Sequence, residues 1–271
     1  MAPVTQATTN KRAMLCLTFD NMGQAMAIGA GRAGAPDPLE PSLAIGYPRM
    51  LGLLDELDFQ GTFFIEGWNG LHHPDRVLEL AERGHEVGLH GWVHEPLASL
   101  DRRRVEQVIH DGTAALDHLG LRPAGFRAPG ALRGPHAASI LADLGYRYDS
   151  STDVAQADDP EEGDQFVEPG LLPSGLAHVP WRHAMVDSIQ YLRRKQGPRK
   201  PEELEARWVA TMDRLAEARA TTTLVVHAYL SGTDDARFSV VRRVLGHVRQ
   251  RGDIEVCTAR TLAERVLAVR H

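Results

Sequence analysis

The chain has 271 residues, of which 43% are hydrophobic and 24% charged, and its formal net charge at pH 7 is −6. This is an ordinary globular composition, with enough length for a full core in one large α/β domain or two small ones. The negative charge argues against nucleic acid or an anionic membrane surface as a partner, and the two cysteines, Cys16 and Cys257, lie in apolar runs as buried thiols rather than in a disulfide framework.

Two further features bear on where the protein works. The opening segment, MAPVTQATTNKR, lacks the apolar core of a signal peptide, and no apolar run is long enough to span a bilayer. We therefore expect a soluble cytoplasmic protein without membrane contact. No internal repeat or low-complexity segment divides the chain, so we treat 1–271 as a single domain. The oligomeric state stays open, and a homo-oligomer is compatible with the sequence.

Short apolar runs rich in strand-forming residues alternate with segments that carry apolar residues at helical spacing. The first run, 13–19, ends at Asp20 and precedes a long loop at 22–41 that is rich in Gly, Ala and Pro. The elements expected after it are, in chain order, a helix at 47–57, a strand at 61–65, a helix at 74–83, a strand at 85–89, a helix at 101–119 capped by Asp101, a strand at 125–128, a helix at 135–144, a strand at 146–148, an acidic loop at 153–169, a strand at 177–181, a helix at 201–219, a strand at 221–226, a helix at 238–250, a strand at 254–257 and a helix at 262–270.

This alternation predicts parallel strands with helices packed outside them. About seven or eight strands in a chain of this length favour a barrel over an open sheet, and barrels of this kind carry their chemistry at the carboxyl ends of the strands. Polar residues that follow or end an apolar run would meet at that edge: Asp20, His90, His94, Arg127, Asp149, Trp181 and His227.

The segment HEVGLHGWVHEPL, at 85–97, contains the strongest single signal for a metal ion. His90 and His94 are four positions apart, so one helical turn would bring both imidazoles to one ion. Gly91 permits a tight backbone between them, and Pro96 stops the turn from growing into a long helix. The alternative is a pair of histidines on a surface loop, since this spacing is common by accident.

Six segments in a fixed order resemble the motifs of the polysaccharide deacetylase family, also called the NodB-homology or carbohydrate esterase 4 family. They are LTFDN at 17–21, LHGWVHE at 89–95, GFRAPGA at 125–131, YDSS at 148–151, VPW at 179–181 and LVVHAYLSG at 224–232. Each motif alone is modest, but the ordered set covers nearly the whole chain. The resemblance implies a distorted (β/α)7-type barrel and the hydrolysis of an amide, usually an N-acetyl group on an amino sugar, assisted by a divalent metal ion.

The resemblance also implies a role for three catalytic residues. Amide hydrolysis needs a base for the attacking water, a group that polarises the carbonyl and an acid for the leaving amine. By position in the motifs, Asp20 is the base and His227 the acid. Arg127 then pairs with Asp20 and holds it ionised. Without the resemblance, His227 in an apolar run would be read as a core histidine.

The same carry-over assigns the binding residues. It places a divalent ion on His90 and His94, with zinc expected because imidazole nitrogen suits this ion. Trp181 would line the substrate cleft. A backbone amide near the YDSS motif helps to bind the oxyanion in the family, and we carry this over loosely. The substrate-binding group is therefore Trp181, Tyr148, Asp149 and, beside Arg127, Pro129.

The sequence departs from the family at Asn21, where the usual third metal ligand is an aspartate. An amide oxygen binds a dication more weakly than a carboxylate and leaves its charge uncompensated. Three outcomes are open: Asn21 still ligates through its oxygen, another carboxylate such as Asp20 completes the site, or tight metal binding is lost. We expect Asn21→Asp to tighten metal binding by at least about tenfold.

The segment after Asn21 has a long Gly/Ala loop in place of the usual Gly-Pro, which resembles a cytoplasmic branch of the family. That branch includes peptidoglycan deacetylases, lipid-linked aminosugar deformylases and allantoinase-like ring-opening amidohydrolases. The leading hypothesis is a metal-dependent hydrolase that removes an acetyl or formyl group from an amino sugar or small acylated amine. The alternatives are an allantoinase-like cyclic-amide hydrolase and a non-catalytic member that binds a small molecule or saccharide.

Overall fold

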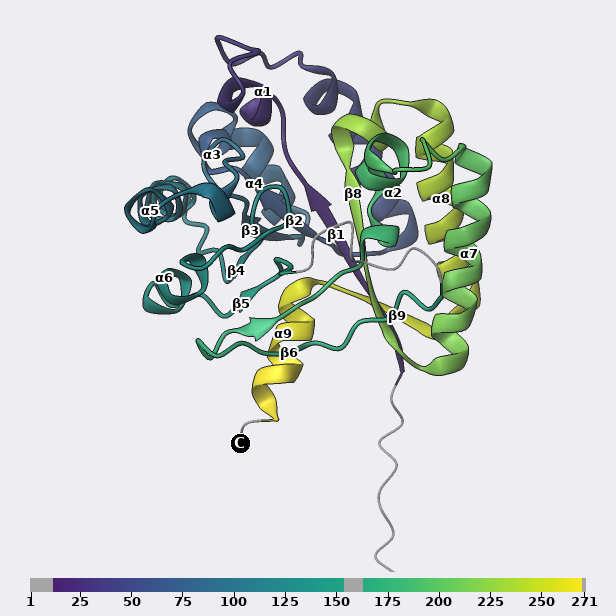
Figure 1. The fold of residues 1–271 in the computed structure, drawn as a ribbon. Helices are drawn as coiled ribbons and strands as arrows, with labels where there is room; N and C mark the ends of the chain where they lie inside the picture. Colours follow the sequence, from purple (N-terminus) through teal and green to yellow (C-terminus); the bar gives the residue numbers. More distant parts are fainter. Residues whose placement is uncertain (1–11, 154–162, 270–271) are drawn as a thin grey trace, which may run out of the picture.

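The computed structural model describes residues 12–153 and 163–269, and a single curved sheet forms its centre (Figure 1). Its nine strands are β1 (Ala13–Asp20), β2 (Thr62–Ile65), β3 (Glu86–Leu89), β4 (Gly125–Phe126), β5 (Tyr148–Asp149), β6 (Gly170–Leu171), β7 (Ala177–His178), β8 (Thr221–His227) and β9 (Ile254–Cys257). Neighbouring strands follow the order β6-β7-β5-β4-β3-β2-β1-β8, and β9 pairs with β1. All of these pairs are parallel except β6 with β7.

Strand β1 organises the sheet, because it pairs with three other strands. It pairs with β8 from Met14 to Asp20, while β9 and β2 share its other side, β9 along its first half and β2 along its second. All of its residues are buried, as expected for a strand covered on both faces. Because these strands are parallel, one edge of the sheet carries the carboxyl ends of β1, β2, β3, β4 and β8.

The helices pack outside the sheet (Figure 1). Helices α3, α4, α5 and α6 cover one flank, and α7 and α8 pack beside each other on the other. Side chains of Asp101, Asp234 and Thr258 accept the backbone N–H three residues on and so begin α5, α8 and α9. No described helix is both long and apolar enough to cross a membrane. The helices are α1 (Ala25–Gly29), α2 (Tyr47–Leu57), α3 (Gly67–His72), α4 (Pro74–Glu82), α5 (Arg102–His118), α6 (Ala137–Asp143), α7 (Pro201–Ala218), α8 (Asp235–Arg251) and α9 (Ala259–Ala268).

The expected fold class, a distorted barrel of parallel strands with outer helices, is confirmed. The barrel is incomplete, since β6 and β8 at the ends of the strand order do not pair with each other in the described part of the chain. Both cysteines are buried and unpaired on neighbouring strands, as expected. The opening segment and most of the acidic loop at 153–169 lie outside the described residues.

The structure differs from the expectations in four local features. The loop expected at 22–41 contains the short helix α1, and the helix α3 was not expected at all. A short antiparallel pair, β6 with β7, follows the acidic loop. The paired histidines do not lie on a helical turn. The segment between them is a turn in which Gly91 has a φ of 73° and His94 a φ of 69°.

Candidate active site

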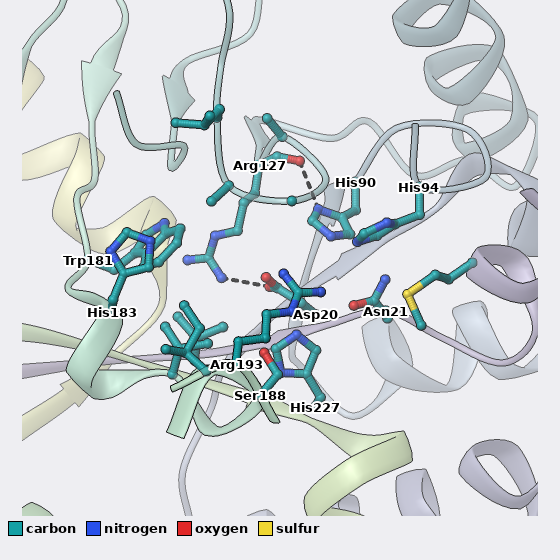
Figure 2. Close-up of a pocket in the computed structure, with 18 of the residues that line it drawn as sticks. Asp20, Asn21, His90, His94, Arg127, Trp181, His183, Ser188, Arg193 and His227 are labelled. Atoms are coloured by element: carbon teal, nitrogen blue, oxygen red, sulfur yellow. Dashed lines mark hydrogen bonds and ion pairs between the residues drawn. The ribbon is translucent and has the colours of Figure 1, made fainter. Parts of the chain in front are cut away.

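Strand register brings the predicted catalytic residues together. Asp20 at the end of β1 is the direct register partner of His227 at the end of β8. On the other side of the site, Leu89 of β3 pairs with Phe126 of β4, so His90 and Arg127 are the next residues on adjacent strands. A cleft of about 160 Å³ opens at this edge, and the predicted residues that line it are Asp20, Asn21, His90, His94, Arg127, Trp181 and His227 (Figure 2).

Asp20 forms a buried ion pair with Arg127. Nη1 of Arg127 donates to Oδ1 of Asp20 at 2.6 Å and to Oγ1 of Thr18 at 2.9 Å. Ser150 accepts from the same guanidinium through its carbonyl oxygen and its hydroxyl, and the guanidinium lies 4.3 Å from the ring centre of Phe64. Because each side of the guanidinium is held, Arg127 has a fixed position from which to orient Asp20.

The environment of Asp20 keeps it ionised. Burial alone would raise the pKa of Asp20, but the charge and hydrogen bond of Arg127, with further contributions from His90 and His227, outweigh burial, and the pKa lies below its usual value. A carboxylate that is ionised at neutral pH and faces a cleft can accept a proton from water. The predicted pairing of Arg127 with Asp20 is therefore present in the structure.

His227 is held by a carboxylate that sequence reasoning missed, Asp187. Nδ1 of His227 donates to Oδ1 of Asp187 at 2.5 Å, and the backbone N–H of His227 donates to Oδ2 at 2.9 Å. The hydroxyl of Ser231 donates to the same Oδ2 at 2.6 Å. The second ring nitrogen of His227 points into the cleft (Figure 2). Burial alone would lower the pKa of His227, but Asp187 outweighs it and the pKa is raised.

His90 and His94 face each other across the turn that joins them. Their ring centres lie 5.2 Å apart. Nδ1 of His90 binds the carbonyl oxygen of Arg127 at 2.8 Å, which leaves Nε2 for the cleft. Oε2 of Glu95 accepts the backbone N–H groups of Trp92 and Val93 and so holds the turn. Burial is the largest cause of a lowered pKa for both rings, to about 4 for His90 and about 3 for His94, so both are neutral at pH 7.

Asn21 lies beside these histidines, and its amide is held from behind. Its Nδ2 donates to Oε1 of the buried Glu66 at 2.6 Å, and its Oδ1 points toward the cleft (Figure 2). The backbone of Asn21 has a φ of 64°, and its carbonyl oxygen accepts from the hydroxyl of Tyr47 at 2.6 Å. Asparagine tolerates this left-handed conformation better than most residues.

The side chains of His90, His94 and Asn21 are chemically suited to bind a divalent ion. Two neutral imidazoles and one amide oxygen are suitable ligands for zinc, although they bring no negative charge of their own. Within 12–153 and 163–269, no three His, Cys, Asp or Glu side chains are arranged to share an ion. His90, His94 and Asn21 therefore remain the predicted ligands, and the carboxylate of Asp20 lines the same cleft.

Three predicted substrate-binding residues do not reach the cleft. The hydroxyl of Tyr148 donates to Oε1 of Glu86 at 2.8 Å, and its backbone N–H donates to Ala124. Asp149 is fully buried against Arg133. Pro129 is also buried. Tyr148 and Asp149 thus support the floor of the site, and their assignment to substrate is not supported by their position.

Pro129 packs instead against Gly91, where an added Cβ would lie 2.8 Å from its Cγ. Trp181 does line the cleft, with its Nε1–H donating to the carbonyl oxygen of Ser150 at 2.7 Å. That bond fixes the indole plane. Sequence reasoning also missed Arg193, which extends over the cleft from the π-helix Ile189–Arg193 (Figure 2).

Comparison with known proteins gives the family. A sequence profile described as "Polysaccharide deacetylase" matches residues 7–148, which is half of the chain. The chain belongs to the polysaccharide deacetylase family. The match includes three of the six motifs and ends at Tyr148, the first residue of the fourth, while the remaining two, which carry Trp181 and His227, lie beyond it.

Individual relatives agree with this assignment. The chain is 31% identical over 110 residues to a peptidoglycan deacetylase-like protein, FGM2, of Gibberella zeae, a match that covers 40% of this chain and 32% of that protein. It is 27% identical over 125 residues to the peptidoglycan deacetylase of Helicobacter pylori, covering 45% of this chain and 43% of that one. The chain thus aligns with less than half the length of these relatives.

Solved structures match the whole chain. A Mycobacterium smegmatis protein assigned to the polysaccharide deacetylases is 27% identical, with a TM-score of 0.80 over 100% of this chain and 95% of that one. The structure of Puue allantoinase has a TM-score of 0.76 over 94% of this chain and 91% of that one. At 18% identity, this second likeness shows a shared fold.

Proposed function

We propose that this protein is a cytoplasmic amide hydrolase that removes an acetyl or formyl group from an amino sugar or a small acylated amine. The observation that carries the proposal is that Asp20 and His227 lie beside each other at the ends of neighbouring strands and both line the cleft. Arg127 lowers the proton affinity of Asp20, whereas Asp187 raises that of His227. Two facing groups whose pKa values are shifted toward opposite protonation states are what a base and an acid in one reaction require.

The chain's residues support a two-step hydrolysis. Asp20 accepts one proton from a water molecule as the water oxygen bonds to the carbonyl carbon of the amide. His227 then donates its proton to the amide nitrogen as the carbon–nitrogen bond breaks, which yields a free amine and an acid. Asp187 holds the imidazole in the orientation that points its second nitrogen at the cleft.

A divalent ion, for which zinc is our choice, would be held by His90, His94 and Asn21 and would polarise the scissile carbonyl. His90 is suited to this task because its Nδ1 is already engaged by the carbonyl of Arg127. Because both imidazoles are neutral at pH 7, no proton has to leave them before they bind an ion.

The size and lining of the cleft favour a small substrate. The enclosed part of the cleft, about 160 Å³, has room for an acyl group and part of one sugar ring, and the cleft is otherwise open to solvent. Trp181, Leu132 and Ile189 contribute apolar surface, on which a methyl group or a sugar face can pack. We therefore place a monomeric acylated amine or amino sugar ahead of a polymer.

The test is an activity screen of the purified protein on N-acetyl and N-formyl amines and amino sugars, reading free acetate or formate together with free amine. Asp20→Asn is the matched control, because it keeps the shape of the side chain and removes the base. We expect equal amounts of acyl product and amine, with turnover falling by about 10² to 10⁴ in Asp20→Asn. Unchanged turnover in this variant would refute the assignment of Asp20.

Cyclic-amide hydrolysis is a second candidate, favoured by the uncharged ligand set around Asn21. A site with a weakly held ion suits a reaction that depends less on the ion. Ring opening releases no separate acyl product, so the same screen separates the two: a cyclic amide consumed without acetate or formate would favour this candidate. A purely ligand-binding protein is disfavoured, because binding alone needs neither the Asp20–Arg127 pair nor the His227–Asp187 pair.

A further inference from the structure

Glu66 is a fully buried carboxylate directly behind Asn21. It follows β2 and precedes α3, and no Arg, Lys or His of the described chain forms an ion pair with it. Its Oε1 accepts from Nδ2 of Asn21 at 2.6 Å. Its Oε2 accepts from the backbone N–H of Met22 at 3.1 Å and from Nδ2 of Asn69 at 3.1 Å. Burying a carboxylate that has no cation beside it is costly, even with these three donors. The presence of Glu66 behind Asn21 therefore needs an explanation.

We propose that Glu66 is a positioning residue that makes an amide, rather than a carboxylate, the suitable group at position 21. Oε1 accepts from Nδ2 of Asn21, and this contact turns Oδ1 of Asn21 toward the cleft. In this way Asn21 and Glu66 together replace the family's single aspartate.

The conformation of residue 21 does not explain the choice of asparagine by itself. Its φ of 64° favours asparagine and aspartate alike over most other residues. The hydroxyl of Tyr47 binds the backbone oxygen of residue 21, which both residues would offer equally. Among the contacts that residue 21 makes in the described part of the chain, only the one with Oε1 of Glu66 distinguishes an amide from a carboxylate.

The hydrogen-bond donors and acceptors at positions 21 and 66 predict how each substitution affects stability. In Asn21→Asp, a carboxylate oxygen replaces Nδ2 and faces Oε1 of Glu66, so two acceptors meet in a buried site. In Glu66→Gln, the new amide can keep its oxygen on the donors of Met22 and Asn69 only if its NH₂ faces residue 21, so Asn21 either loses its partner or turns its Oδ1 away from the cleft. In the double exchange, the introduced glutamine donates its NH₂ to the introduced aspartate and accepts from Met22 and Asn69, so every group has a partner again.

The contact with Glu66 also changes the metal affinity that we expect for Asn21→Asp. The gain of at least about tenfold expected for Asn21→Asp assumed that the new charge stands alone. In the structure it would lie against Glu66, and repulsion between the two carboxylates would oppose the substitution. The double exchange places a single carboxylate at position 21, beside the cleft, with an amide behind it at position 66.

The test is thermal unfolding of four proteins in a chelator-containing buffer: the parent, Asn21→Asp, Glu66→Gln and the double variant. We expect each single change to lower Tm by roughly 3 to 8 °C, and the double variant to return to within about 2 °C of the parent. A single variant that does not fold while the double variant does would also support the proposal. If the double variant loses as much as the two single changes together, the proposal is wrong.

Glu86→Gln provides the matched control. Glu86 is another buried carboxylate, held by hydroxyl donors of Thr62 and Tyr148 and by the side chain and backbone N–H of Arg260, and it does not line the cleft. Combining Glu86→Gln with Asn21→Asp should add the two losses of Tm. Recovery in this combination would show that the rescue by Glu66→Gln is not specific and would overturn the proposal.

A competition titration with a chromophoric chelator gives a second readout that does not depend on turnover. The double variant should bind zinc at least about tenfold more tightly than the parent, because it presents a carboxylate beside His90 and His94. Equal affinities would show that residue 21 does not face the ion. Both tests stand whether or not amide hydrolysis is found, so their failure is separate from that of the proposed function.

Discussion

At the scale of single residues, the carboxylate of Asp187 sets the proton affinity of His227. Asp187→Asn should lower the pKa of His227, because it replaces a charge that stabilises the imidazolium with a neutral amide. An acid works only while protonated, so the rate falls as pH rises through its pKa. The alkaline limb of the pH–rate profile should therefore move to lower pH in the variant. An unchanged alkaline limb would mean that His227 does not supply the proton.

Arg127 has the corresponding effect on Asp20 at the acidic side of the profile. Removing its charge should raise the pKa of Asp20, and a base fails once it is protonated. Arg127→Ala should thus move the acidic limb to higher pH, and Arg127→Lys, which retains the charge but not the planar fork, should move it less. Equal shifts in the two variants would show that the charge of Arg127 is not the cause.

At the scale of elements, the turn between β3 and α5 positions the two metal-binding histidines. Gly91 has a φ of 73°, and an added Cβ would lie 2.8 Å from Cγ of Pro129. Gly145 has a φ of 82° with open space around it, so Gly145→Ala is a control for backbone strain alone. Strain at such a position costs about 1 to 2 kcal/mol. We expect both variants to lose stability in thermal unfolding.

Only Gly91→Ala should also reduce zinc content, measured by elemental analysis after equilibration with zinc, because only this change displaces the turn that carries His90 and His94. The double variant His90→Ala/His94→Ala sets the level expected for complete loss. Equal zinc content in Gly91→Ala and Gly145→Ala would show that the turn does not position the ligands. Zinc retained by the double histidine variant would place the ion elsewhere.

At the scale of the whole molecule, the sequence predicts the helices and strands that are marked by apolar periodicity. It misses the elements and side-chain pairs that depend on contacts between residues far apart in the chain. Helix α2 begins and ends where its apolar spacing predicts, and β1 extends one residue beyond its apolar run. The family motifs lead to Asp20 and His227 because each directly ends a strand. Helix α3 was missed because it is short and contains two glycines. Its Gly67 packs so closely on Gly112 that an added Cβ would lie 2.4 Å from the Cα of Gly112.

The missed residues of the site have a common cause. Asp187 and Glu66 are isolated acidic residues in apolar surroundings, and each acts through a partner about 40 positions away. No periodicity or spacing marks such a pair. One chemical rule could have prompted a search: a catalytic histidine usually has a carboxylate on its other nitrogen. The sequence alone does not say which of its 36 acidic residues this is.

The central claim is that an acid–base pair across the cleft hydrolyses an amide, and His227→Ala tests it most directly. Turnover of this variant is compared on two substrates with the same acyl group, an amide and an activated ester. An amine leaves only with a proton, whereas a phenoxide leaves without one, so the loss of rate should be at least about tenfold greater for the amide. Equal losses on the two substrates would contradict the account, because His227 would then not be the acid for the leaving group.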